Sequence, residues 1–214
     1  MTLLRRDYDI AVVGAGPTGC VTAVAFARKG ARVLLLEANP KACSRFAGEW
    51  IHPPGAKVLE SLDISLREET AEHPPCEGFV VFPDDGTEPI RLPYADGAFG
   101  LSCEHERLVM GLRRRAEACA GVDYIPHARV SSIDSEGLTF CRRETGTNET
   151  ILAERVVGAD GRSSIVRQYL DMPENSTLLS YMAGIDLYDV ELPFEGYGHV
   201  ILGAPGPVLL YRTG

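Results

Sequence analysis

The chain has 214 residues, and 45% of them are hydrophobic, which is enough for one large folded domain or two small ones. The chain has 21 basic and 30 acidic residues, so its formal net charge is -9. A polyanion would therefore be repelled over most of the surface. We therefore expect no nucleic-acid partner. The six cysteines are scattered without a close pair, which argues against a zinc site and a disulfide framework, so no metal site is predicted.

Targeting signals are not predicted. Arg5 and Arg6 lie near the start, but no apolar stretch follows them before the first predicted strand. No apolar run approaches the roughly 18 residues that a membrane span requires. We expect no transmembrane segment, reduced thiols and a cytoplasmic location.

The most informative segment lies near the start, where an apolar run at 9–13 meets Gly14-Ala15-Gly16-Pro17-Thr18-Gly19. A helix-like stretch follows and leads to a second apolar run at 32–37, which ends in an acid. Strand, glycine turn, helix, strand and acid is the order of the βαβ unit that binds a dinucleotide. We expect Gly14 to allow the tight turn, Gly16 to let a diphosphate approach the backbone, and Gly19 to let the helix pack closely on the sheet.

Glu37 closes the second predicted strand at about the 20-residue spacing that the dinucleotide fingerprint expects. It can accept hydrogen bonds from a ribose, while the N–H groups at the start of the helix face the phosphates. Two plainer interpretations stay open. The triplet could be an ordinary strand-to-helix turn rich in glycine, and Glu37 could be a solvated carboxylate at a strand end.

Further along, the sequence predicts a loop over 38–52 and a short helix over 53–62 that begins with prolines. Strand-like pieces at 78–82 and 90–92 flank a turn and predict a hairpin. A strand-like piece at 99–101 leads into a helix over 104–119. That helix carries the basic run Arg113-Arg114-Arg115, which we interpret as a solvated face.

Short alternating segments at 124–125, 128–133, 138–142 and 151–152 predict a small antiparallel addition to the main sheet. A buried strand at 155–158 then ends in a turn at Asp160-Gly161, and Ser163 is expected to cap a helix that ends near residue 169. Beyond residue 173 the pattern predicts strands only, at 178–187, 200–202 and 208–212. These strands and the hairpin form a second, β-rich region that looks unfinished.

Four segments together resemble the FAD-dependent monooxygenases of the para-hydroxybenzoate hydroxylase type, in the branch that includes squalene epoxidase. They are the glycine fingerprint with its acid, 45–50 (RFAGEW) followed by Pro54-Gly55, 106–112 (ERLVMGL), and 158–164 (GADGRSS). The resemblance implies an α/β fold: a Rossmann-like FAD-binding domain in two sequence pieces, with a partial β-rich substrate domain. We expect the FAD-binding pieces at 1–74 and 98–172, the substrate-domain hairpin at 75–97, and the start of the substrate sheet at 173–214.

The resemblance also extends the set of expected cofactor contacts. Arg45 would lie along the FAD, Trp50 would lie close to it, and Arg107 matches a second cofactor-contacting arginine of the family. The backbone of Val130 would meet the adenine, and Asp160 belongs to the second fingerprint, associated with FAD and with the reduced pyridine nucleotide. With the glycine turn, the full expected set is Gly14, Ala15, Gly16, Gly19, Glu37, Ala38, Arg45, Trp50, Arg107, Val130 and Asp160.

Each family-derived residue also has a plainer interpretation. Arg45 and Arg107 could be surface charges of a loop and a helix, Trp50 and Val130 could be packing residues, and Asp160 could belong to a loop and N-cap without ligand.

One family feature is missing, because the chain has no Gly-Asp dipeptide and therefore lacks the third fingerprint, whose aspartate holds the ribityl chain of the flavin. The resemblance covers about the first half of a full-length family member. The chain could be a fragment, could be completed by a second chain, or could be a remnant that binds a nucleotide without turnover.

The leading hypothesis is an FAD-dependent monooxygenase, an epoxidase or a hydroxylase, that uses NADPH or NADH and O2 on an apolar organic or polyketide-like small molecule. Because the cofactor supplies the redox chemistry, no catalytic acid or base is named. The alternatives are a flavin-dependent prenyl-chain reductase or halogenase, and a non-catalytic nucleotide-binding module.

Overall fold

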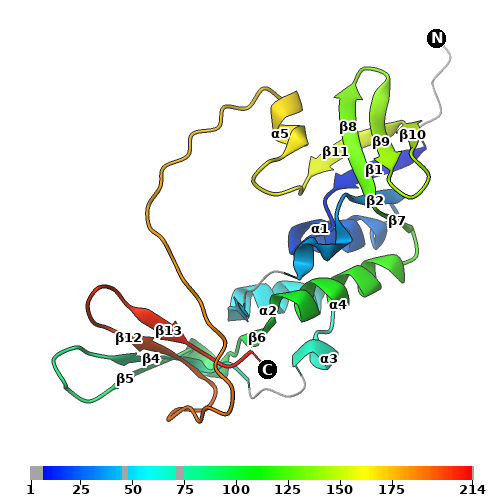
Figure 1. The fold of residues 1–214 in the computed structure, drawn as a ribbon. Helices are drawn as coiled ribbons and strands as arrows, with labels where there is room; N and C mark the ends of the chain where they lie inside the picture. The colour runs from blue at the N-terminus through cyan, green and yellow to red at the C-terminus, as the bar shows by residue number, and fades with distance from the viewer. Residues whose placement is uncertain (1–6, 45–47, 71–74, 214) are drawn as a thin grey trace. The chain divides into compact units, whose positions relative to one another are not determined.

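The structure is a computed structural model that describes residues 7–44, 48–70 and 75–213 (Figure 1). The chain forms two compact units. The first consists of residues 1–44 and 109–180, and the second of residues 45–108 and 181–214. The predicted domain limits, after residues 74, 97 and 172, differ from the limits of these units and stay a prediction.

The first unit is built on a parallel four-stranded sheet with the strand order β11-β1-β2-β7. Its strands are β1 (Tyr8–Val13), β2 (Val33–Glu37), β7 (Val122–Pro126) and β11 (Ala153–Gly158). The central strands are almost continuously apolar, because both faces of a parallel sheet are covered and side chains on either face are buried. Val12, Val33, Leu34 and Leu35 are accordingly inaccessible to solvent.

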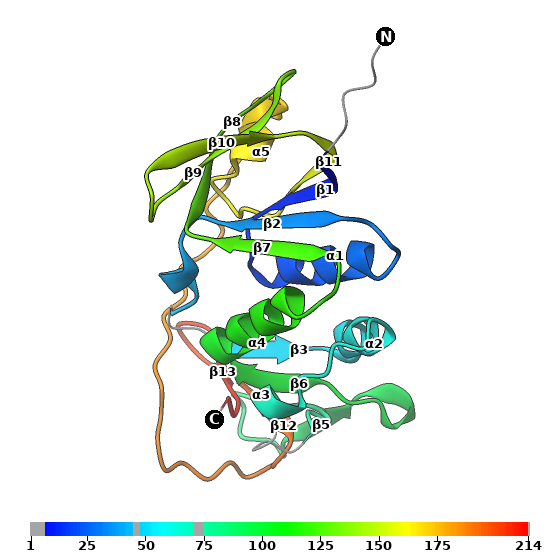
Figure 2. The same cartoon turned by 90° about the vertical axis from the view of Figure 1, so that its right-hand side faces the viewer.

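Different layers cover the two faces of this sheet (Figure 2). Helix α1 (Pro17–Ala27) packs against β1 and β2 on one face. A three-stranded antiparallel sheet and the short helix α5 (Ile165–Tyr169) cover the other. The strands of this sheet are β8 (Ala128–Asp134), β9 (Gly137–Arg142) and β10 (Thr147–Ile151).

The core between the two sheets follows from strand alternation, since every second side chain of a strand points to the same face. Ala11 and Val13 of β1, and Leu34 and Leu36 of β2, pack there against side chains from the antiparallel sheet. Phe140 is the largest buried side chain of this cluster.

The second unit contains a four-stranded sheet with the order β13-β12-β4-β5. Its strands are β4 (Gly78–Phe82), β5 (Ile90–Pro93), β12 (Tyr197–Ile201) and β13 (Val208–Leu210). Strands β4 and β5 pair antiparallel, which confirms the predicted hairpin, whereas β12 pairs with β4 in parallel. The unit also holds β3 (Gly48–Ile51) paired with β6 (Leu101–Glu104), and helices α2 (Pro53–Ser61) and α3 (Arg67–Thr70).

The boundary between the two units falls within helix α4 (His105–Glu117). Its residues up to 108 belong to the second unit, and those from 109 onward belong to the first. Two one-turn 3-10 helices, η1 (Pro40–Cys43) and η2 (Ala95–Gly97), complete the regular structure of the described residues. The α/β fold class predicted from the sequence is confirmed.

Five local predictions were wrong. The strand predicted to be buried at 155–158 forms as part of β11, but Arg155 and Gly158 are exposed. Residues 122–126 do not join an antiparallel addition, because β7 pairs in parallel with β2 in the main sheet. Residues 178–187 form no strand and have no ladder partner, although they carry strand-forming side chains. The expected loop at 38–52 contains η1 and β3. The cap of α5 is Ser164, whose hydroxyl accepts a hydrogen bond from the Arg167 N–H, rather than Ser163.

Membrane-spanning helices were also sought. Within residues 7–44, 48–70 and 75–213, every helix is too short or too polar to cross a bilayer.

Candidate functional site

The glycine turn between β1 and α1 lies at the edge of the parallel sheet where the strands end. Gly14 has φ +99°, and a Cβ atom there would lie 2.4 Å from the carbonyl oxygen of Ala159. A Cβ atom on Gly19 would lie 1.8 Å from the carbonyl oxygen of Gly14. Neither position can take a side chain, because the opposing atoms are backbone and cannot move aside. The predicted conformational roles of both glycines therefore have a direct geometric reason.

Gly16 differs from its two neighbours in the motif. A Cβ atom placed on it would meet nothing within 4 Å, so the space in front of it is open. Gly16 is the N-cap of α1, where it provides no side-chain cap, and the first turn of the helix contains no acidic residue. The first N–H groups of a helix have no partner within the helix and lie at the positive end of its dipole. The start of α1 is therefore open and suited to an anion.

Glu37, the last residue of β2, turns its carboxylate back toward the glycine turn. Its Oε2 accepts a hydrogen bond from the Ala15 N–H at 2.9 Å, and its Oε1 accepts one from the Asn39 N–H at 2.7 Å. The predicted acid is therefore fixed beside the turn rather than solvated at a strand end. Ala38, the next residue along the chain, is half-buried at the same edge.

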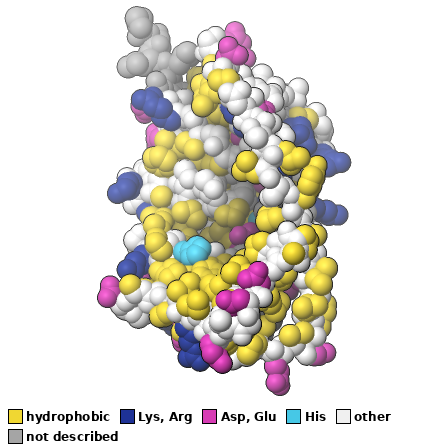
Figure 3. Space-filling view, turned by 90° about the vertical axis from the view of Figure 1, so that its left-hand side faces the viewer, with side chains coloured by type: hydrophobic (Ala, Val, Ile, Leu, Met, Phe, Trp, Pro, Cys, Tyr) yellow, Lys and Arg dark blue, Asp and Glu magenta, His cyan; other side chains and the backbone are white. Residues whose placement is uncertain are grey.

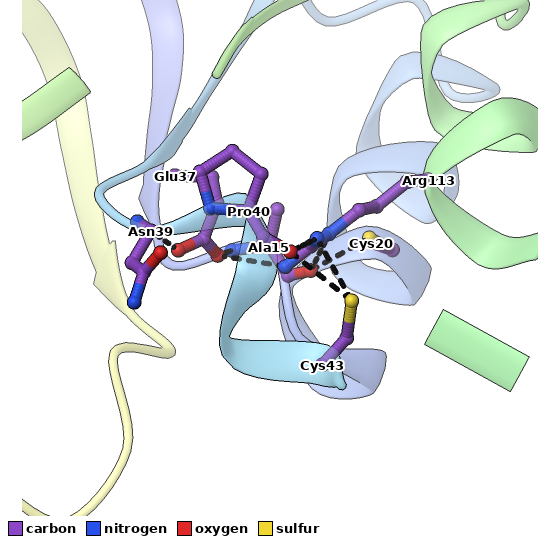
Figure 4. Close-up of polar contacts among 7 residues, drawn as sticks. All are labelled: Ala15, Cys20, Glu37, Asn39, Pro40, Cys43 and Arg113. Atoms are coloured by element: carbon purple, nitrogen blue, oxygen red, sulfur yellow. Dashed lines mark hydrogen bonds and ion pairs between the residues drawn. The ribbon is translucent and has the colours of Figure 1, made fainter. Parts of the chain in front are cut away.

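Arg113 of α4 completes this group of residues, as Figure 4 shows. Its Nε donates to the carbonyl oxygen of Ala15 at 2.8 Å, and its Nη1 donates to that of Pro40 at 2.6 Å. Its Nη2 forms an ion pair with Glu37 Oε2 at 3.2 Å. Only 7% of the Arg113 side chain and 12% of the Glu37 side chain are exposed, so the pair is largely shielded from water.

The interpretation of Arg113-Arg114-Arg115 as a solvated face was therefore wrong for Arg113, although Arg114 is exposed. The helix rotates about 100° per residue, so three consecutive arginines cannot share one face. Val109, Leu112 and Ala116 are buried, and Arg113 continues their i, i+3, i+4, i+7 pattern. An arginine at such a stripe position was the signal that could have identified it from the sequence.

Two buried thiols border the same residues. Cys43 Sγ lies 3.6 Å from Arg113 Nη1 and 3.1 Å from the carbonyl oxygen of Pro40. Cys20 Sγ lies 3.5 Å from the carbonyl oxygen of Ala15. Burial raises the pKa of Cys20 to about 12, against a smaller opposing effect of Arg113, so this thiol stays protonated at neutral pH.

The turn after β11 approaches the same edge, because β11 lies beside β1 with Gly158 opposite Val13. Asp160 follows this strand, and its Cα would lie 2.8 Å from a Cβ atom on Gly14, so the two turns are packed against each other. Its Oδ2 accepts the Ile165 N–H at 2.7 Å, at the start of α5. Its Oδ1 is buried and has no hydrogen-bond partner among the described residues.

Val130 lies in β8 and is buried in the core cluster of the first unit. The register between β8 and β9 shifts between Val130 and Ser132, so the ladder is interrupted directly after it. A role of its backbone toward adenine stays a prediction.

Two further predicted residues, Trp50 and Arg107, lie in the second unit. Trp50 lies in the second unit, where its indole N–H donates to the Tyr94 hydroxyl at 2.9 Å and its ring lies 5.1 Å from that of Phe79. Arg107, also in the second unit, donates to the carbonyl oxygen of Glu68 at 3.2 Å. Arg45 lies outside the described residues. Cofactor contacts of these three stay predictions.

The first unit thus has the parallel sheet, the glycine turn and the acid-terminated second strand that define a dinucleotide-binding α/β domain. Residues 7–205 match the family described as "FAD binding domain", and the chain belongs to this family. The predicted family and its FAD cofactor are thereby confirmed.

Curated relatives include the squalene epoxidase erg1 of Aspergillus fumigatus, 32% identical over 99% of this chain and 46% of the relative. The squalene monooxygenase of Mus musculus is 26% identical over 99% of this chain and 38% of the relative. The chain spans less than half the length of both. The crystal structure of p-nitrophenol 4-monooxygenase PnpA from Pseudomonas putida is similar in fold, with a TM-score of 0.64 and 21% identity over 76% of this chain and 43% of that one.

Proposed function

We propose that the first unit binds FAD, with the diphosphate at the start of α1 and the adenosine ribose beside Glu37. The observation that carries this proposal is the contrast within the glycine turn. Gly14 and Gly19 are closed in by backbone atoms, whereas Gly16 faces open space in front of an uncapped helix. An opening of this kind lets a phosphate approach the backbone N–H groups. Only a glycine leaves this space unoccupied, because every other residue would place a Cβ atom there.

The charges around the turn fit a bound diphosphate. The first turn of α1 carries no carboxylate, and the Glu37 carboxylate fixed beside the glycine turn is paired with Arg113. Asp160 Oδ1 is a buried acceptor without a donor among the described residues, and such groups normally have a partner. A sugar hydroxyl or an ordered water would supply that donor.

Bound FAD supplies the electron transfer and oxygen activation, and the residues of this chain supply binding and orientation. The α1 N–H groups would hold the diphosphate, and Glu37 and Asp160 would accept hydrogen bonds from hydroxyl groups. We further propose that Arg45, Trp50 and Arg107 contact the cofactor, that Val130 meets the adenine through its backbone, and that Ala38 completes the ribose site.

The proposed activity is that of an FAD-dependent monooxygenase, an epoxidase or a hydroxylase, acting in the cytoplasm. It would consume NADPH or NADH and O2 and act on an apolar organic or polyketide-like substrate. Squalene is the first substrate to test, because the curated relatives are named for it. Because this chain spans less than half of those relatives, the activity is proposed for a complete fold, whose remainder lies either on a longer form of this chain or on a second chain.

FAD binding is tested by titrating the wild-type chain, Gly16→Ala and the control Gly206→Ala while following flavin fluorescence. An added Cβ meets nothing within 4 Å at either glycine, so both variants should fold. Because alanine is a poorer N-cap residue than glycine, the thermal midpoint of Gly16→Ala is measured beside its Kd. The Gly16→Ala methyl group would occupy the space of the diphosphate and raise the Kd for FAD by about fivefold or more, since overpacking costs about 1–3 kcal/mol. A wild-type chain that takes up no FAD, or equal Kd values for both variants, would contradict the proposal.

The activity needs a separate measurement. The FAD-loaded chain is mixed with NADPH or NADH, and O2 consumption is recorded with and without squalene. The proposal expects oxygen uptake that increases with substrate. Tight FAD binding without any NADPH or NADH oxidation, even after addition of a candidate partner chain, would instead indicate a non-catalytic nucleotide-binding module.

A further inference from the structure

Arg113 is the one buried arginine among the described residues, and the glycine fingerprint does not include it. We infer that Arg113 is a positioning residue that orients the Glu37 carboxylate so that one acceptor site remains for the ribose of a bound dinucleotide. This inference rests on the proposed FAD binding of the first unit and assigns a role to a side chain that need not touch the ligand.

The Glu37 carboxylate can accept only a limited number of hydrogen bonds. An ionised carboxylate has about four lone-pair sites, two on each oxygen. On Oε2, the Ala15 N–H and Arg113 Nη2 occupy two. On Oε1, the Asn39 N–H occupies one. Among the described residues, one site on Oε1 is therefore left for a ligand donor such as a ribose hydroxyl.

Arg113 links three segments of the first unit. Its three nitrogen atoms donate to three separate segments: the glycine turn at Ala15, the 3-10 helix η1 at Pro40, and the end of β2 at Glu37 (Figure 4). A planar guanidinium has five N–H donors in a rigid fork and can satisfy three such acceptors at once. A lysine ammonium is a compact point charge and cannot reach all three from one position.

Arg113 also provides the counter-charge of Glu37. Glu37 Oε2 lies within hydrogen-bond distance of the Ala15 N–H, in the same turn where a diphosphate would bind. A carboxylate there without a counter-charge would repel the phosphates, and it would also be costly to bury. Arg113 compensates that charge. Glu37 can therefore accept a hydrogen bond from the ribose while the N–H groups at the start of α1 bind the diphosphate.

The experiment compares the Kd for FAD with the Kd for its 2′-deoxyadenosine analogue, which lacks one ribose hydroxyl. Wild-type protein should prefer FAD by about tenfold, the size expected of a hydrogen bond to a charged acceptor. In Arg113→Met the preference should fall to about one, because Glu37 is no longer aimed. Arg114→Met, one residue further along the same helix and exposed, is the matched control and should keep the wild-type ratio.

A second comparison separates positioning from a purely structural role. Arg113→Met leaves the Glu37 carboxylate buried without its cation and should lower the thermal midpoint, whereas adding Glu37→Gln removes that charge and should restore part of the loss. The ratio of the two Kd values should stay near one in this double variant. If Arg113→Met yields no folded protein, Arg113→Lys decides, with an expected ratio between one and the wild-type value.

The outcomes are distinguishable. Wild-type protein that binds FAD, with a wild-type Kd ratio in Arg113→Met or in Arg113→Lys, would overturn the inference and leave the proposed function intact. Wild-type protein that binds no FAD would overturn the proposed function, and the inference with it.

Discussion

The two four-stranded sheets of this chain are built from similar apolar segments but bury them very differently. In the parallel sheet of the first unit, β2 is buried along its length up to Glu37, because layers cover both faces. In the sheet of the second unit, the inner strands bury Val80 and His199, whereas Ile90 and Leu92 of the outer strand β5 are about half exposed, at 53% and 51%. The composition of a strand alone therefore does not predict how much that strand contributes to the free energy of unfolding.

The largest expected effect comes from truncating a side chain of the parallel sheet. Leu35 of β2 is inaccessible to solvent, so Leu35→Ala should lower the free energy of unfolding by about 2–5 kcal/mol through lost burial and a cavity. Hydrogen exchange of the β1 and β2 amides, together with urea unfolding followed by far-UV circular dichroism, would measure it. Leu92→Ala is the matched control in β5, and equal losses in both variants would refute the contrast between the sheets.

An intermediate effect is expected at His199, the buried polar residue of β12. Neither of its ring nitrogens has a hydrogen-bond partner among the described residues, and its ring stacks on Phe82 at 5.5 Å. Burial lowers the pKa of His199 below its ordinary value of 6.5. The unfolded chain therefore binds a proton below about pH 6.5 that the folded state binds less well, and the second unit should lose stability as the pH falls through this range.

His199→Phe should remove this pH dependence and stabilise the second unit by about 1 kcal/mol at pH 8, because a phenyl ring has no unsatisfied nitrogen to bury. Trp50 is the only tryptophan and lies in the second unit, so urea unfolding followed by its fluorescence reports on that unit. Wild type and variant are compared at pH 5 and pH 8. A wild-type unit that is equally stable at both values would show that His199 is protonated without cost.

The smallest effect is expected at the outer strand of the second sheet. Ile90→Thr in β5 keeps a β-branched side chain where more than half of the residue is exposed, so the free energy of unfolding should change by no more than about 0.5 kcal/mol. Self-association should decrease, because an apolar outer strand is a template for pairing with another chain. Sedimentation velocity at increasing protein concentration would show this, and unchanged association would mean that β5 does not mediate it.

The start of the fold was predictable because its signals are local. The apolar run, the glycine spacing, the helix and Glu37 all lie within about one βαβ unit, and each has a conformational reason that can be read from neighbouring residues. The hairpin of β4 and β5 was predictable for the same reason, since a turn joins two adjacent strands.

Two failures were local, the one-turn helix η1 and the cap of α5 at Ser164, whereas the others concern partners that are distant in sequence. The segment 122–126 has the pattern of a short strand, but its parallel pairing with β2 depends on the helix that precedes it. Residues 178–187 have strand-forming side chains and no partner strand, and backbone pairing, rather than propensity, decides whether a strand forms. Arg113 was missed because its acceptors, Ala15 and Glu37, lie 98 and 76 residues away.

The unpaired segment before β12 has a practical consequence for work with this chain. Leu179, Tyr181, Met182 and Tyr188 each expose more than four-fifths of their surface, and apolar side chains also lie open to solvent on the face drawn in Figure 3. An extended backbone with exposed leucine and aromatic residues is a good substrate for chymotrypsin-like proteases. The same exposed apolar side chains bind detergents and column resins non-specifically. Purification should therefore use protease inhibitors and low protein concentrations, and the first clip under limited digestion should fall between residues 178 and 188.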